Sequence, residues 1–291
     1  MDFKKSSIFC ACLAPIFLVG CGGSDSASVG TQKYDGITTA VVLDAENQAQ
    51  IATNSIQITP SLIQASIYND IPSPFDHLDG QNNCNGSVQP DGTNHIYSDF
   101  CINDAIANGS VNVSLNSSSS VASYSNFTLT FDTLDYILSG NIQAQRLSAN
   151  RLSNVFDFTV LNNDQEFSFY ISEECTVTTN SAGETSGISG CDVSIIDNEH
   201  ITPYKMDDFT SDLDNSLNRD ISGELFLSEY GYLDYRADNL MLCDEGDFEF
   251  ESGKIILTDD LGSQITIINN GCDADTDIGP QISFIPAVTE E

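Results

Sequence analysis

The sequence predicts a mainly β protein, formed by an antiparallel sheet or a sandwich of hairpins, with one or two short helices near its N-terminal end. From about Cys84 onward, apolar and polar residues alternate with the period of two that is typical of half-buried strands. The segments between these strands lack a helical pattern, which argues against a parallel sheet with crossover helices. Cysteines at equal distances from turn signals are a third indication, because such residues lie opposite each other in hairpins.

The chain begins with a basic segment followed by an apolar run. Lys4 and Lys5 precede apolar and small residues that extend from Ile8 to Gly20. A helix that crosses the hydrocarbon core needs about 20 residues, so this shorter run is typical of the central part of a signal peptide. The run ends in Leu18-Val19-Gly20-Cys21. Residues 1–20 are therefore predicted to be removed, so that the mature protein begins at Cys21.

These N-terminal features resemble the lipobox of bacterial lipoproteins, over about the first 21 residues. The resemblance implies that the Cys21 sulfur carries a diacylglyceryl group and that the new amino terminus is acylated, which together anchor a protein stably in a membrane. Gly22, rather than an aspartate, follows the cysteine. In the Gram-negative members of the family, this implies sorting to the outer membrane, with the periplasmic and the surface-facing orientation both open. An ordinary secretory leader with an accidental Cys21 is the alternative.

The mature chain is expected to consist of a tether and a globular part. Residues 21–33 are small and polar, and predict a flexible tether with a reach of about 20 Å. Residues 34–291 are expected to form a disulfide-clasped β-rich domain, with two subdomains or weak repeats as open possibilities. Three similar segments begin with Ser-Gly at residues 139, 222 and 252. We interpret each as a turn followed by a strand.

Two short helices are predicted between residues 44 and 67, packed as a plug or lid against the sheet. Asp44 is the expected N-cap of the first, and Thr59-Pro60 the cap and first-turn proline of the second. Apolar residues at helical spacing follow each start, namely Ala45, Ala49, Ala52 and Ile56, and then Leu62, Ile63 and Ile67.

The later segments predict strands with one buried face and one face in water. Phe156, Phe158 and Val160 should pair with Phe167, Phe169 and Ile171 across a turn at residues 162–164. The same alternation recurs at Phe127, Leu129 and Phe131, Leu225 and Leu227, Leu233 and Tyr235, Phe248 and Phe250, Ile255 and Leu257, and Ile265 and Ile267.

Six cysteines remain after Cys10 and Cys12 leave with the signal and Cys21 is lipidated. Cys84 and Cys101 are centred between Gly92 and Thr93, beside the turn signal Asp91-Gly92, and Cys175 and Cys191 are centred on Gly183. Opposed residues in a hairpin lie within bridging distance, so both pairs are predicted disulfides. Cys243 and Cys272 are paired by elimination. Because their midpoint falls in a strand over residues 254–257, that connectivity is open and needs a return through Asn270-Gly271.

The charge of the chain limits its partners. It holds 43 acidic residues against 9 Lys and Arg, and the mature part retains 42 against 7. Such a surface repels phosphate backbones, so nucleic acid is not an expected partner. Asp273, Asp275 and Asp277 alternate as in calcium loops, but Gly279 comes one position late and Phe284 stands where an EF-hand has glutamate. A possible calcium site and a solvated acidic loop are therefore alternatives.

Catalysis is not expected from the motifs. The histidines are His77, His95 and His200, without a second ligand at metal spacing, and no nucleophile or phosphate-loop motif is present. The acidic run Asp244, Glu245, Asp247, Glu249 and Glu251 alternates with phenylalanines, which indicates the solvent face of a strand.

The sequence therefore predicts a lipid-anchored, non-catalytic binding or structural module of the cell envelope, attached to the outer membrane through its anchor and in contact with an unknown protein. The alternative is a carrier of lipophilic ligands, in which phenylalanines of a curved sheet hold an acyl chain under the N-terminal helices.

Overall fold

The computed structural model describes residues 33–71, 86–102, 105–115, 119–131, 134–148, 150–162, 165–179, 185–213, 219–243, 250–269, 271 and 280–287. Several predicted features lie outside these residues, namely the signal peptide, Cys21, the tether up to residue 32, His77, Cys84, the acidic run 244–249, Cys272, and Asp273, Asp275 and Asp277. In the described part, no helix has both the length and the apolarity that a membrane span requires.

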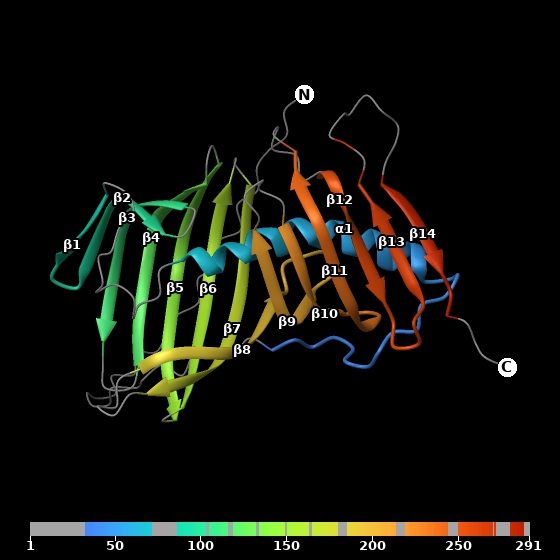
Figure 1. Cartoon of the computed structure of the whole chain (residues 1–291), viewed down its shortest axis with the longest axis horizontal. Helices are drawn as coiled ribbons and strands as arrows, with labels where there is room; N and C mark the ends of the chain where they lie inside the picture. Colours follow the sequence, from blue (N-terminus) through green and yellow to red (C-terminus); the bar gives the residue numbers. More distant parts are fainter. Residues whose placement is uncertain are drawn as a thin grey trace, which may run out of the picture. The chain divides into compact units, whose positions relative to one another are not determined.

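The mainly β fold class is confirmed. Fourteen antiparallel strands form one sheet, in which each strand pairs with its neighbours in the sequence (Figure 1). The strands are β1 (Ser87–Asp91), β2 (Asn94–Ile102), β3 (Ala105–Leu115), β4 (Ser119–Phe131), β5 (Leu134–Ser148), β6 (Arg151–Asn162), β7 (Gln165–Thr179), β8 (Thr185–Asp197), β9 (Tyr204–Leu213), β10 (Arg219–Leu227), β11 (Gly231–Leu242), β12 (Phe250–Thr258), β13 (Gln264–Ile268) and β14 (Gln281–Ile285).

The pairing register follows the predicted hairpins. In β1 and β2, Asp91 lies opposite Asn94, so the turn falls at residues 92 and 93 as expected. In β6 and β7, Phe158 lies opposite Phe169, which confirms the predicted pairing. Successive side chains in these strands point to opposite faces of the sheet, so a slip of one residue would move every apolar side chain into water. Burial of one face therefore fixes the register.

The described residues contain one of the one or two short helices expected, and the predicted start of a second helix at Thr59-Pro60 is wrong. One α-helix, α1 (Gln48–Ala65), continues through Pro60 and is followed by a 3-10 turn, η1 (Ser66–Asp70). Proline normally interrupts a helix because it lacks an N–H and crowds the preceding turn. Here every residue from Ile58 to Tyr68 is buried, so packing outweighs the local cost. The Thr59 hydroxyl also donates a hydrogen bond to the Ser55 carbonyl, at 2.6 Å.

Asp44 caps a turn before the helix rather than the helix itself. Its carboxylate accepts hydrogen bonds from the backbone N–H groups of Glu46 and Asn47, at 2.8 and 2.9 Å. Asn47 occupies the N-cap position of α1. The predicted start was therefore early, because the first apolar residues belong to this turn.

The three Ser-Gly segments are not turns, which corrects the sequence interpretation. They lie inside β5, β10 and β12, next to strands that contain β-bulges. A bulge brings extra backbone close to its neighbour, and glycine leaves room for it. A Cβ atom on Gly223 or Gly253 would lie 2.6 Å from a carbonyl oxygen of the adjacent strand. The bulged strands carry four non-glycine residues with positive φ, Asp99, Asn126, Asp208 and Asn239.

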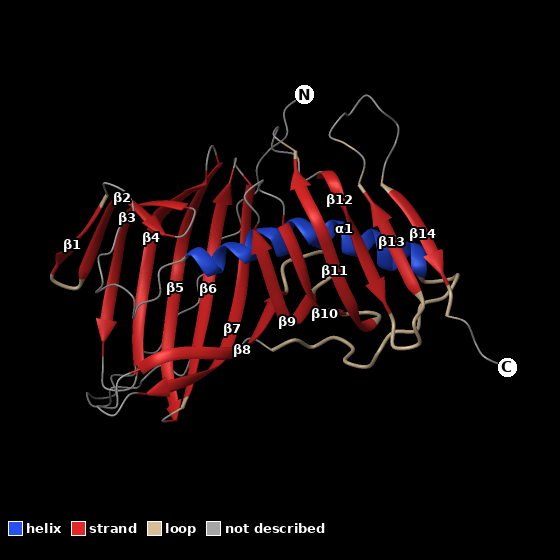
Figure 2. Ribbon diagram, viewed as in Figure 1, coloured by secondary structure: helices blue, strands red, loops and turns tan. Residues whose placement is uncertain are grey.

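The sheet is nearly interrupted between β8 and β9. These strands pair only through Ile195 to Asp197, opposite Tyr204 to Met206, whereas β7 and β8 pair along most of their length. We call β1–β8 the first half-sheet and β9–β14 the second half-sheet. Helix α1 contacts β7, β10 and β13 and thus packs against both (Figure 2). The core of the described residues forms between this helix and the inner face of the sheet.

Candidate functional site

The junction between the two half-sheets contains a chain of hydrogen bonds. Asp197 ends β8, and His200 lies in the loop that leads to β9. The His200 Nδ1 atom lies 2.8 Å from an Asp197 carboxylate oxygen, and its Nε2 atom lies 3.1 Å from the Ser61 hydroxyl on α1. The chain therefore connects α1 to the end of β8 and the β8–β9 loop, which lie 139 residues from Ser61 in the sequence.

The hydrogen-bond chain of Ser61, His200 and Asp197 is largely withdrawn from water. Asp197 and Ser61 are each 4% exposed, whereas the His200 side chain is 24% exposed. A carboxylate withdrawn from water needs compensating donors, and Asp197 has them in the His200 ring and the Glu199 backbone N–H, the latter at 2.9 Å. The Tyr204 ring packs edge-on against the His200 ring, with 5.5 Å between centroids. Burial, followed by the negative charge of Asp197, raises the pKa of the Tyr204 hydroxyl well above its usual value.

A serine hydroxyl, an imidazole and a buried carboxylate in series form the arrangement that activates serine nucleophiles. Ser61 differs from such nucleophiles in its position. It lies inside α1, where its own N–H belongs to the helical ladder, and it follows Pro60, which has no N–H to donate. An oxyanion needs free, convergent donors, which this stretch of helix does not offer. The arrangement thus holds α1 to the junction.

A second set of contacts ties the end of the helix to both half-sheets. The Tyr68 ring in η1 packs against Phe156 of β6 and Phe209 of β9, with centroid distances of 5.4 and 6.3 Å. Arg219 of β10 donates a hydrogen bond to the Ser66 hydroxyl at 2.7 Å. These contacts, together with the Ser61–His200–Asp197 chain, connect the two half-sheets where β8 and β9 pair through only three residues.

Sequence reasoning missed this site. His200 was considered only as a metal ligand, and Ser61 and Asp197 were not singled out. Ser61 and His200 are 139 residues apart, and no motif spacing signals a contact at that distance. The only local signal is the pair Asp197 and His200, which lie three residues apart in a loop.

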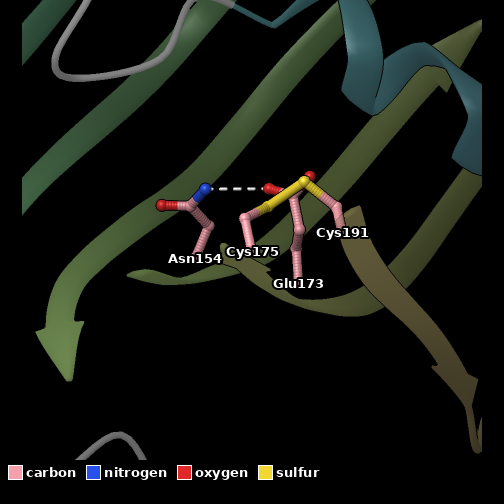
Figure 3. Close-up of a disulfide and its surroundings, with 4 residues drawn as sticks. All are labelled: Asn154, Glu173, Cys175 and Cys191. Atoms are coloured by element: carbon pink, nitrogen blue, oxygen red, sulfur yellow. Dashed lines mark hydrogen bonds between the residues drawn. A yellow bond between two sulfur atoms is a disulfide. The ribbon is translucent and has the colours of Figure 1, made fainter. Parts of the chain in front are cut away.

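The predicted disulfide between Cys175 and Cys191 is present (Figure 3). The two residues lie directly opposite in β7 and β8, with a Cα–Cα distance of 4.0 Å. Glu173 lies beside them and accepts a hydrogen bond from the Asn154 side chain at 2.8 Å. Glu173 and the two sulfur atoms are close enough to share a metal ion. Because the sulfurs are bonded to each other, they are not thiolate ligands, so this cluster is structural.

The remaining cysteine pairs are described only in part. Cys101 and Cys243 are each disulfide-bonded, while their predicted partners, Cys84 and Cys272, lie outside the described residues. The calcium cluster at Asp273, Asp275 and Asp277 also lies outside them and stays a prediction.

The outer face of the sheet, away from α1, differs between the half-sheets. Strands β3 and β4 contain no charged residue, and their outward side chains are largely Ser, Thr and Asn. In contrast, Asp207, Glu224 and Asp234 lie directly opposite one another on β9, β10 and β11. Partial burial, followed by the charges of the surrounding aspartates, raises the pKa of the Glu224 carboxyl. The described molecule therefore presents one uncharged polar surface and one acidic surface.

Comparisons of the chain with protein-family models, with curated proteins and with solved structures find no match.

Proposed function

We propose that this protein is a lipid-anchored, non-catalytic module of the cell envelope, which acts through the outer face of its sheet. The observation that carries the proposal is the position of α1. The helix packs on the inner face against β7, β10 and β13 and is itself buried from Ile58 to Tyr68. Recognition of a partner is then left to the outer face.

The packing of the inner face favours this proposal over the carrier alternative. A carrier needs aromatic side chains that line a space for an acyl chain. The inward Phe127 and Phe158 are 0% and 1% exposed, and both belong to one core cluster with Ile58 and Leu62 of the helix. In the described part, these side chains fill the place that a lipophilic ligand would occupy.

The outer surface of β3 and β4, together with Asn141 of β5, is the proposed binding surface. Its Asn112, Ser123 and Asn141 side chains are exposed and lie in one row across β3, β4 and β5. Ser123 donates a hydrogen bond to the Asn141 amide oxygen at 2.7 Å. These three side chains carry no charge, and the row ends at the exposed Asp157 of β6, which lies opposite Asn141. They can hydrogen-bond a neutral partner despite the net charge of −34. The predicted anchor at Cys21 would hold this surface near the membrane.

Photocrosslinking in the native envelope tests the proposal. A photoreactive amino acid replaces Asn141 on the proposed surface, and in a matched variant it replaces the exposed Asp234 on the acidic surface. We expect a discrete crosslinked band from position 141 that is absent at position 234. Equal crosslinking at both positions would contradict the choice of surface.

The anchor and the carrier alternative are tested separately by mass spectrometry. The intact protein should carry diacylglyceryl and acyl groups, and a Cys21→Ala variant should lose them. Solvent extraction of the purified protein should release no stoichiometric lipid beyond those covalent groups. A bound acyl ligand at one per chain would overturn the non-catalytic module in favour of the carrier.

A second candidate function follows from the Ser61–His200–Asp197 distances alone, namely acyl transfer through Ser61. A fluorophosphonate probe labels activated serines, so it distinguishes a structural Ser61 from a nucleophilic Ser61. If Ser61 is structural, the folded protein stays unlabelled, as does Ser61→Ala. Labelling that disappears in both Ser61→Ala and His200→Ala would show an active nucleophile and contradict the non-catalytic proposal.

A further inference from the structure

The two edges of the sheet are protected differently. Strand β1 contains Pro90, which cannot donate to a neighbouring strand and therefore discourages pairing at that edge. Strand β14, from Gln281 to Ile285, contains neither proline nor charge. Among the residues that the structure describes, β13 is the only strand that pairs with it. Its other edge presents backbone donors and acceptors that another strand can bind.

The sequence of β14 closely matches that of its partner. Strand β13 reads Gln-Ile-Thr-Ile-Ile and β14 reads Gln-Ile-Ser-Phe-Ile. The two pair in antiparallel fashion around Thr266 and Ser283, so that Ile265 lies opposite Phe284 and Ile267 opposite Ile282. The five-residue pattern of β14 thus already pairs with a closely similar pattern, that of β13, inside the molecule.

We propose that the free edge of β14 binds β14 of a second copy of this chain. Antiparallel pairing around Ser283 would repeat the β13–β14 register, with Ile282 opposite Phe284 of the second copy. The resulting contact has twofold symmetry, as most homodimers do. It would also cover Ile282 and Ile285, which are 47% and 60% exposed.

The distribution of charge favours this edge for self-association. Two copies with a net charge of −34 repel each other, and they approach with least repulsion where acidic side chains are absent. Strands β13 and β14 themselves hold no charged residue, whereas β9 to β12 each hold at least one acidic residue. The nearest acidic residues before β14 in the sequence are Asp273, Asp275 and Asp277, in the segment that joins β13 to β14. Association should therefore strengthen as salt screens the distant charges.

Disulfide trapping tests the contact in the full chain, expressed with its own leader. Residues opposite each other across an antiparallel pair lie within bridging distance, so Ser283→Cys should give a covalent dimer on a non-reducing gel. Ile201→Cys is the matched control, because Ile201 is 96% exposed but lies in the β8–β9 loop. A monomeric Ser283→Cys, or equal dimerisation of both variants, would overturn the proposal.

A charge exchange at the same position separates loss of contact from loss of folding. Two differently tagged copies are co-purified from one cell. Ser283→Lys in both copies, or Ser283→Glu in both, should reduce co-purification by about tenfold, because like charges would face each other. Ser283→Lys in one copy with Ser283→Glu in the other should restore it. Failure of this rescue would contradict pairing around Ser283, since misfolded variants would not complement each other.

Discussion

The two half-sheets share a fold pattern but are stabilised by different means. The first half-sheet has strands of up to 15 residues, an uncharged outer surface on β3 and β4, and the Cys175–Cys191 disulfide. The second has shorter strands and a charged outer surface, where Asp238 binds both Arg236 and Lys254. It also holds the opposed acidic residues around Glu224.

This difference shows where each half depends on the rest of the molecule. Long ladders and a covalent link hold the first half-sheet together locally. The second half-sheet tolerates like charges on its outer face, because its inner face packs on α1. Since β8 and β9 pair through only three residues, the helix and the junction contacts add to the link between the halves.

Tyr68→Ala should have the largest effect, because this ring contacts both half-sheets. Loss of a buried aromatic ring costs about 3–5 kcal/mol of unfolding free energy, which chemical denaturation can measure. Tyr68→Phe keeps the ring contacts and should stay within about 1 kcal/mol of the wild type. A cost below about 1 kcal/mol for the alanine variant would mean that the halves are joined elsewhere.

The Cys175→Ser/Cys191→Ser double variant should lose about 3 kcal/mol, as expected for a disulfide that closes a loop of 16 residues. The loss should be concentrated in the first half-sheet. Hydrogen exchange measured by mass spectrometry would then show faster exchange in β7 and β8 than in β10 and β11. Equal acceleration in both halves would contradict local stabilisation by the disulfide.

Ser61→Ala should lower stability by about 1 kcal/mol, because the His200 ring loses a hydrogen-bond partner at the junction. Thr53→Ala is the matched control on the same helix. Its exposed hydroxyl bonds only the Ala49 carbonyl, so the change should stay within about 0.5 kcal/mol. Thermal melting of the two variants measures the difference. Equal effects would mean that the Ser61–His200 contact does not stabilise the connection between the half-sheets.

Asp238→Asn should cost at most about 1 kcal/mol at neutral pH, since Arg236 and Lys254 are largely in water. Burial alone would raise the pKa of Asp238, but the hydrogen bonds and charges of Arg236 and Lys254 outweigh it and lower the pKa. The stability that comes from the lowered pKa is present above the ordinary pKa and is lost as pH falls through the folded value. The difference between variant and wild type should therefore begin to shrink as pH falls through the ordinary aspartate pKa of about 4 and disappear below the lowered folded pKa. A constant difference would contradict this ion pairing.

Glu224→Gln should have the smallest effect and the opposite sign. The raised pKa of Glu224 means that its ionised form is unfavourable in the folded protein. Removal of the charge should raise stability at neutral pH by a few tenths of a kcal/mol, as for other like-charge pairs across strands. The gain should vanish below about pH 4, where carboxyls bind protons, and shrink with added salt. Destabilisation at neutral pH would show that the acidic row is not repulsive.

Several strands and their local pairing are encoded directly in the sequence pattern. The alternation of Phe156, Phe158 and Val160, and the equal spacing of Cys175 and Cys191 about a turn, predicted the observed register. These features are encoded by residues that lie close together along the chain, since an antiparallel hairpin fixes its partners through side-chain period and turn position.

Only the tertiary structure decided how the helix and the two halves combine. The sequence places Thr59-Pro60 at the start of a second helix, but burial on both half-sheets keeps α1 continuous. The Ser-Gly segments carried a turn signal, yet the approach of a bulged neighbour places them inside strands. Ser61 contacts His200, which lies 139 residues further along the chain. Such contacts depend on which surfaces the whole chain brings together, and no local pattern records them.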